Sequence, residues 1–211
     1  MKGLVIHMIM KNDITYFTKE AIVEFLREFG EPKTKDYELA ATLIIHHFCE
    51  KRWGKDCWIG FRIRPQYTNS LPAYNSEREI SLKEIAELLR KGIDEDSPVD
   101  FLVVKRASMQ KAQGMVFQVK RFGIGRIKKD TDELVAYFNS FTKKYSKTQA
   151  NLLICLDDGV QINMKKLITN FDTSNSPFNR ILFTWLLDGM VFIKDVYPLG
   201  GLEKYLIAEL Y

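Results

Sequence analysis

The sequence predicts an α/β protein with a mixed central sheet that is flanked by helices and extended by a C-terminal β-hairpin. Segments with helical periodicity alternate with short apolar segments typical of strands. The helical segment 131–145 precedes a buried, strand-like run, Asn151–Leu156, which is the pattern of a parallel β-α-β step. Asp188-Gly189 stands between two apolar runs and predicts the hairpin.

Length and composition are those of a folded domain. The chain has 211 residues, of which 46% are hydrophobic and 12% aromatic, so it can bury a sizeable core. We expect a single domain over residues 1–211. No apolar run is long enough to span a membrane, and three cysteines without CxxC spacing are typical of reduced thiols. We therefore expect a cytoplasmic protein that is not associated with a membrane.

The first hundred residues contain two strand-like segments and three segments that begin like helices. The start, MKGLVIHMIM, is typical of a strand or extended segment, and Cys57–Pro65 alternates like a strand with Arg62 and Arg64 on one face. The helical segments each follow an N-cap signal: Lys19–Phe29 after Thr18, Tyr37–Arg52 after Asp36, and 82–91 after the capping box of Ser81 and Glu84. We expect Tyr37–Arg52 to pack centrally, because it is apolar around most of its circumference.

A polar turn centred on Met109 joins two apolar strands, Val99–Lys105 and Met115–Phe122. Residues equidistant from the turn lie opposite each other in an antiparallel pair. This rule places Asp100 across from Gln118, since each is nine residues from Met109.

Three polar side chains should therefore converge at the open end of this hairpin. Side chains alternate along a strand, so Gln118 and Lys120 share one face and Val119 points away. Burying the charges of Asp100 and Lys120 among apolar neighbours is costly, which calls for a reason. The alternative is an ordinary core hairpin whose charges reach solvent at the strand ends.

Asp100 followed by Gln118-Val119-Lys120 resembles the signature of the PD-(D/E)xK nuclease superfamily. The Gln-x-Lys form is similar to that of the Mrr-type restriction endonucleases. Val99 separates Pro98 from Asp100, so the Pro-Asp pair of the signature is not literal. The resemblance covers residues 37–157 and implies a restriction-endonuclease-like core: helix, three antiparallel strands, helix, strand.

The resemblance implies a metal-dependent endonuclease that hydrolyses phosphodiester bonds, with DNA as the favoured substrate. It implies a catalytic group of Asp100, Gln118, Lys120 and Glu38, with Lys120 orienting water or stabilising the charged transition state. It also implies Mg²⁺ or Mn²⁺ held by Asp100, Gln118, the Val119 carbonyl and Glu38. Glu38 matches the acidic residue that the superfamily often places on its first core helix; alternatively, it only complements the positive end of that helix.

Basic residues concentrate around the candidate site. The chain carries a net charge of +4, but residues 100–150 alone contain 11 Lys and Arg against 4 Asp and Glu. This excess suits a polyanionic partner, although solvated surface lysines would look the same. We expect nucleic acid, with DNA favoured. The residues expected to contact it are Arg121, Arg126, Lys128, Lys129, Arg62 and Arg64.

The remaining patterns are helical or strand-like. The adjacent His46 and His47 would point about 100° apart on a helix, which argues against a shared zinc ion. The C-terminal part predicts these elements: helix Thr131–Tyr145 behind Asp130 and Glu133, a short helix Met164–Phe171, strands Arg180–Leu187 and Met190–Asp195, and a helical turn or two within Gly201–Tyr211.

A second class of function stays open. A nuclease-fold module could bind nucleic acid or a protein partner without cutting, because Gln118 is neutral and the role of Glu38 is unsettled. The C-terminal hairpin could supply an edge for a homodimer, or its apolar side chains could belong to the ordinary core.

Overall fold

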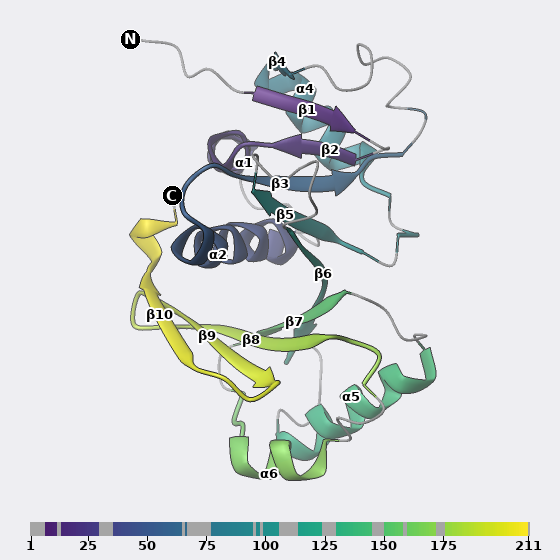
Figure 1. Ribbon diagram of the computed structural model, residues 1–211, viewed down its shortest axis with the longest axis vertical. Coiled ribbons are helices and arrows are strands. Elements are labelled where there is room, and N and C mark those ends of the chain that lie inside the picture. The colour runs from purple at the N-terminus through teal and green to yellow at the C-terminus, as the bar shows by residue number, and fades with distance from the viewer. Residues whose placement is uncertain are drawn as a thin grey trace. The chain divides into compact units, whose positions relative to one another are not determined.

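The computed structural model describes residues 7–11, 14–29, 36–64, 66, 77–94, 96–97, 99–105, 114–123, 130–144, 150–157, 160–171 and 176–210. The chain is an α/β protein with parallel and antiparallel strand pairs, as the sequence predicts (Figure 1). Its contacts divide it into two compact units, Met1–Val116 with Tyr211 and Phe117–Leu210. The expectation of a single domain over residues 1–211 stays a prediction.

The N-terminal unit contains an antiparallel sheet. The strand order is β5-β3-β2-β1-β4, and Figure 1 shows β1, β2, β3 and β5 side by side. Their bounds are β1 His7–Lys11, β2 Ile14–Phe17, β3 Cys57–Arg62, β4 Glu77–Glu79 and β5 Phe101–Lys105. Alternating side chains fill the core from these strands, and Phe17, Ile59 and Val103 are completely buried.

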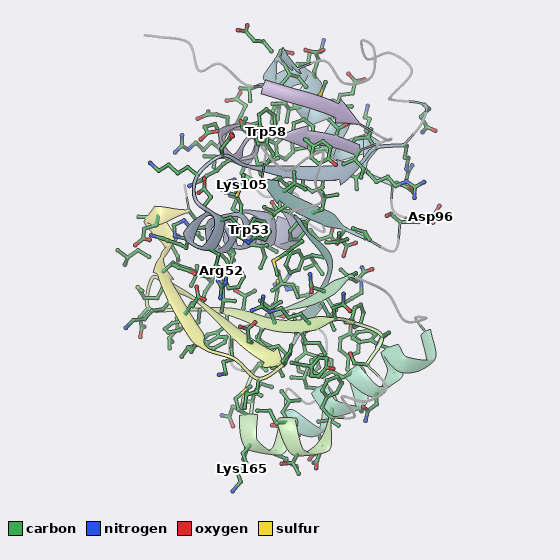
Figure 2. The ribbon with its side chains drawn as sticks, viewed as in Figure 1. Arg52, Trp53, Trp58, Asp96, Lys105 and Lys165 are labelled. Atoms are coloured by element: carbon green, nitrogen blue, oxygen red, sulfur yellow. The ribbon has the colours of Figure 1, made fainter. Side chains whose placement is uncertain are left out.

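Three helical segments belong to the same unit: α1 Lys19–Phe29, α2 Asp36–Trp53 and α4 Leu82–Glu87, which continues as a π-helical turn over Leu88–Gly92. Helix α2 is buried along most of its length, which confirms its expected central position. Its C-terminal carbonyl at Trp53 accepts a hydrogen bond from Lys105 Nζ at 2.5 Å, which satisfies one of the open acceptors at the helix end (Figure 2).

Two of the predicted helix starts are confirmed by their capping hydrogen bonds. The Ala21 amide donates to Thr18 Oγ1 at 3.4 Å. At α4 the Glu84 amide donates to Ser81 Oγ and the Ser81 amide donates to the Glu84 carboxylate, which completes the capping box. Both caps involve side chains within three residues of the helix start. No helix in the described ranges is long and apolar enough to cross a membrane.

The C-terminal unit contains a mixed sheet with strand order β10-β9-β8-β7-β6. Strands β6, β7 and β8 are mutually parallel, whereas β8, β9 and β10 form an antiparallel meander (Figure 1). The bounds are β6 Gly114–Phe122, β7 Asn151–Leu156, β8 Arg180–Leu187, β9 Met190–Tyr197 and β10 Leu202–Leu206; β6 begins in the N-terminal unit. The parallel β6-α5-β7 step and the β8–β9 hairpin are thus confirmed.

Two helices accompany this sheet, α5 Thr131–Lys144 and α6 Met164–Asn170. Asp130 Oδ1 caps α5 by accepting from the Asp132 and Glu133 amides, each at 3.1 Å. The Phe138 ring of α5 lies 5.2 Å from that of Phe171 and 5.7 Å from that of Phe183 on β8. These aromatic contacts hold the crossover helix on the sheet.

Several predictions were wrong or incomplete. The helical turn or two expected within Gly201–Tyr211 is confirmed only in part, because strand β10 comes first and a single 3-10 turn, Ile207–Glu209, follows it. Strands β2 and β4 were not predicted, and β5 begins at Phe101, two residues later than expected, so Asp100 lies in the bend before the strand. Pairing with the preceding strand β9 explains the first error, because this ladder makes a strand of a segment whose own residues are compatible with a helix.

Candidate active site

Strand β6 carries the central pair of candidate residues inside an apolar sheet. Phe117, Val119 and Phe122 are completely buried, and Gln118 is only 4% exposed. The parallel ladder pairs Gln118 with Leu152 and Lys120 with Ile154, so both polar side chains stand in a row of apolar neighbours on one face. The sequence predicted that Gln118 and Lys120 share a face, which follows directly from the strand period.

Lys120 is the more unusual member of this pair. Its side chain is half-buried, and it forms no ion pair with any residue in the described part of the chain. A lysine can bury its aliphatic stem beside residues such as Ile154 while its ammonium group stays hydrated. An ammonium group held in this way beside a buried amide can bind an anionic ligand.

Asp100 and Glu38 belong to the N-terminal unit, whereas Gln118 and Lys120 belong to the C-terminal unit. Asp100 is half-buried just before β5, and Glu38 is half-buried in the first turn of α2. The pairing of Asp100 with Gln118 therefore stays a prediction. One contact agrees with the proposed turn symmetry: a Cβ on Gly114 would lie 2.8 Å from Val104 Cγ1, and both residues are five positions from Met109.

The expected metal ligands are all hard oxygen donors. Among the described residues, no group of three His, Cys, Asp or Glu side chains is placed to hold a metal ion. The expected set is of another kind, because it combines the carboxylates of Asp100 and Glu38 with the Gln118 amide and the Val119 carbonyl. Oxygen donors of these types suit Mg²⁺ or Mn²⁺. The residue types therefore fit the ion.

Arg121 follows Lys120 on β6 and points to the opposite face. Its Nε donates to Asp157 Oδ1 at 2.6 Å, and the Asp157 amide donates to the Phe122 carbonyl at 3.0 Å. Gly123 has φ +131°, and a Cβ there would lie 2.8 Å from the Asp157 Cβ. Glycine is thus required beside this ion pair.

Asp157 was not among the candidate residues predicted from the sequence, although its position at the end of a predicted strand could have indicated it. It directly follows β7, which runs parallel to β6, so the ends of the two strands meet at one edge. The Arg121 side chain is 43% exposed and can still contact a phosphate.

The other predicted phosphate contacts have mixed outcomes. Arg62 lies 3.5 Å from Asp94, measured from Nε to Oδ2, so part of its charge is already neutralised. Arg64 follows β3 and is half-buried. Arg126, Lys128 and Lys129 lie outside the described residues.

His46 has a structural role in α2. Its Nε2 lies 2.8 Å from the Cys57 carbonyl oxygen, to which it donates a hydrogen bond, and its Nδ1 lies 3.6 Å from Glu50 Oε2. Burial lowers the pKa of this histidine, which favours the neutral ring. All three cysteines are free, and burial raises the pKa of the Cys57 thiol to about 11.

No protein-family model, curated protein or solved structure matches this chain significantly.

Proposed function

We propose that this protein is a metal-dependent endonuclease that hydrolyses phosphodiester bonds in DNA, built on a restriction-endonuclease-like fold. The observation that carries the proposal is the pair of Gln118 and Lys120 on one face of a strand whose other central positions are buried and apolar. The half-buried Lys120 has no ion-pair partner among the described residues, so its ammonium group is available to an anionic ligand. A catalytic role would use that positive charge.

The order of elements supports the same proposal. Helix α2 is followed by β3 and, after β4 and α4, by β5, which pairs antiparallel with β3; then come β6, α5 and β7, which is parallel to β6. The nuclease resemblance implies this succession, with Asp100 at the second core strand and Gln118-Val119-Lys120 on the third. Asp100 lies one residue before β5, and the Gln-x-Lys group lies in the middle of β6.

The chemistry follows from the residue types. Cleavage of a phosphodiester needs an oriented water molecule and positive charge where the transition state becomes more negative. A bound Mg²⁺ or Mn²⁺ would acidify the water and polarise the phosphate. Asp100 supplies the negative charge that attracts the ion, and Lys120 supplies a fixed positive charge beside the phosphate. Because Gln118 is neutral, the site attracts the metal less strongly than a pair of carboxylates would.

Substitution of Lys120 tests this assignment. Lys120→Ala should reduce Mg²⁺- or Mn²⁺-dependent plasmid cleavage by about 100-fold or more, because transition-state charge depends on it, while DNA binding changes little. Asp100→Ala should abolish cleavage by removing a metal ligand. The measurement is the rate of nicking and linearisation of plasmid DNA, methylated and unmethylated, with a chelator as blank.

Lys165→Ala is the matched control, because Lys165 is an exposed lysine on α6 with no role in the proposed site (Figure 2). It should cut like the wild type. Equal cleavage by Lys120→Ala and the wild type would refute the catalytic role of Lys120.

The neutral Gln118 favours one alternative, a nuclease-fold module that binds nucleic acid or a protein partner without cutting. A site with one fewer carboxylate than the usual pair can lose its metal altogether. Wild-type protein that binds DNA yet cuts no plasmid with either metal would establish this alternative.

A further inference from the structure

An exposed apolar surface covers the antiparallel meander β8–β10. Within the described ranges, all large hydrophobic side chains that are strongly exposed lie on these strands or in the turn before β10: Leu186, Leu187, Leu199, Leu202 and Leu206, at 52–62% exposure. Large apolar side chains that are exposed together on one part of a protein often mark an interaction site.

The strand register places most of this surface on one face. Leu206 is paired with Met190, which is paired with Leu187 on β8, so these side chains form one row across the meander. Phe192 and Trp185 form the next row, with their rings stacked at 5.2 Å and an interplanar angle of 5°. Leucines at both ends of β10 thus border an aromatic pair.

Strand β10 also has an open edge. Among the described strands it pairs only with β9. The Asp195 amide donates to the Gly201 carbonyl, and the Ile207 amide donates to the Gly189 carbonyl. Because hydrogen-bonded pairs alternate in an antiparallel ladder, Glu203 and Tyr205 direct their main-chain groups to β9. Leu202, Lys204 and Leu206 therefore direct their N–H and C=O groups outward.

We propose that β10 pairs antiparallel with β10 of a second copy of this chain, around a two-fold axis at Lys204. In this register the outward main-chain groups of Leu202, Lys204 and Leu206 all find partners. Leu202 of each copy faces Leu206 of the other, since the sequence Leu-Glu-Lys-Tyr-Leu has leucine at both ends. The same strand is therefore its own complement, which favours a second copy over an unrelated partner.

Lys204 makes this register less favourable, because it lies opposite the Lys204 of the second copy across the two-fold axis. Like charges directly opposite each other destabilise a strand pair, and a lysine on an edge strand discourages unlimited association. The pairing should therefore be reversible and should become stronger as salt screens the two ammonium groups. The two-fold axis also ends growth at the dimer. The interface does not depend on the proposed nuclease activity.

Sedimentation equilibrium and light scattering on the full chain test the proposal. The wild type should show a reversible monomer–dimer equilibrium that shifts toward the dimer at high salt. Leu202→Asp and Leu206→Asp should each raise the dissociation constant by at least about tenfold, because they put two carboxylates into the apolar pairs. Leu186→Asp is the matched control: Leu186 is equally exposed but lies on β8, so this variant should dimerise like the wild type.

Charge exchange at Lys204 tests the register itself. Lys204→Thr should dimerise more tightly than the wild type because the repulsion is gone. Lys204→Glu should repel its own copy, yet mixed with the wild type it should give more heterodimer than random exchange predicts. Native mass spectrometry of the mixture measures this excess, and circular dichroism verifies that every variant is folded.

Two outcomes would overturn the proposal. One is a wild type that stays monomeric at about 0.1 mM, where a dimer with a dissociation constant of about 1 μM would be almost fully formed. The other is a dimer that is unaffected by Leu202→Asp and shows no heterodimer excess with Lys204→Glu, since another surface would then form the contact.

Discussion

The imidazole of His46 lies inside the N-terminal unit, where it donates to the Cys57 carbonyl and faces Glu50 across 3.6 Å. Burial disfavours its charged form more than the carbonyl and Glu50 favour it, so its pKa lies below the usual 6.5. The unfolded chain then binds a proton more readily than the folded chain. The contribution of the neutral His46 ring to the free energy of unfolding is complete above about pH 6.5. It decreases as the pH falls through the interval between the pKa of the unfolded chain and that of the folded chain.

We expect this single residue to produce a measurable pH dependence of folding. Between the unfolded and the folded pKa, its share of the free energy of unfolding should fall by up to about 1.4 kcal/mol per pH unit. His46→Gln keeps a donor for the Cys57 carbonyl but cannot titrate, so its stability should decline less between pH 7 and pH 5. Urea unfolding of both proteins across this range gives the comparison. Equal slopes would show that His46 is not the titrating group.

At the scale of elements, Phe138 is a central contact between α5 and its sheet. Phe138 contacts Phe171 in the segment after α6 and Phe183 on β8, and it is 1% exposed. Its removal would leave a cavity that rigid neighbouring rings cannot fill.

Phe138→Ala should lower the free energy of unfolding by about 3–5 kcal/mol. Ser140→Ala, on the exposed side of the same helix, should change it by less than about 0.5 kcal/mol. Denaturant titration monitored by circular dichroism measures both. A loss below about 1 kcal/mol for Phe138→Ala would mean that the aromatic cluster does not hold the helix.

The elements that the sequence predicted well are those with local causes. The caps at Thr18, Ser81 and Asp130 depend on side chains within three residues of the helix start, and the β8–β9 turn depends on Asp188-Gly189, both at positive φ. Strand β10 could not be predicted in the same way. Leu-Glu-Lys-Tyr-Leu is compatible with a helix, and only its ladder with β9 makes it a strand.

The same distinction between local and distant causes applies to the candidate site. That Gln118 and Lys120 share a face follows from the strand period and needs no tertiary information. The position of Asp100 relative to Gln118 depends on the polar turn between β5 and β6. The length of this turn can be counted in the sequence, but its path cannot be predicted from it. The Arg121–Asp157 ion pair was missed because it joins β6 to the residue after β7, and a complete helix separates the two in the sequence.

At the scale of the whole molecule, the proposed activity and the proposed dimer have a joint consequence. A two-fold dimer presents two identical catalytic groups related by the same symmetry that relates the strands of duplex DNA. In the proposed enzyme, one monomer would hold one catalytic group and break one phosphodiester bond per encounter. The proposed dimer would break both strands before it dissociates.

The products of plasmid cleavage should therefore depend on protein concentration. Above the dissociation constant of the dimer, the wild type should convert supercoiled plasmid directly to the linear form. Leu206→Asp should accumulate nicked circles first, because its monomers act singly, while its rate of first cleavage stays near that of the wild type. Leu186→Asp should keep the wild-type pattern. Gel quantification over time gives the ratio of linear to nicked product. An equal ratio for Leu206→Asp and the wild type would show that cleavage of both strands does not depend on the dimer. If neither protein cuts, the nuclease proposal is rejected, and sedimentation alone then tests the dimer.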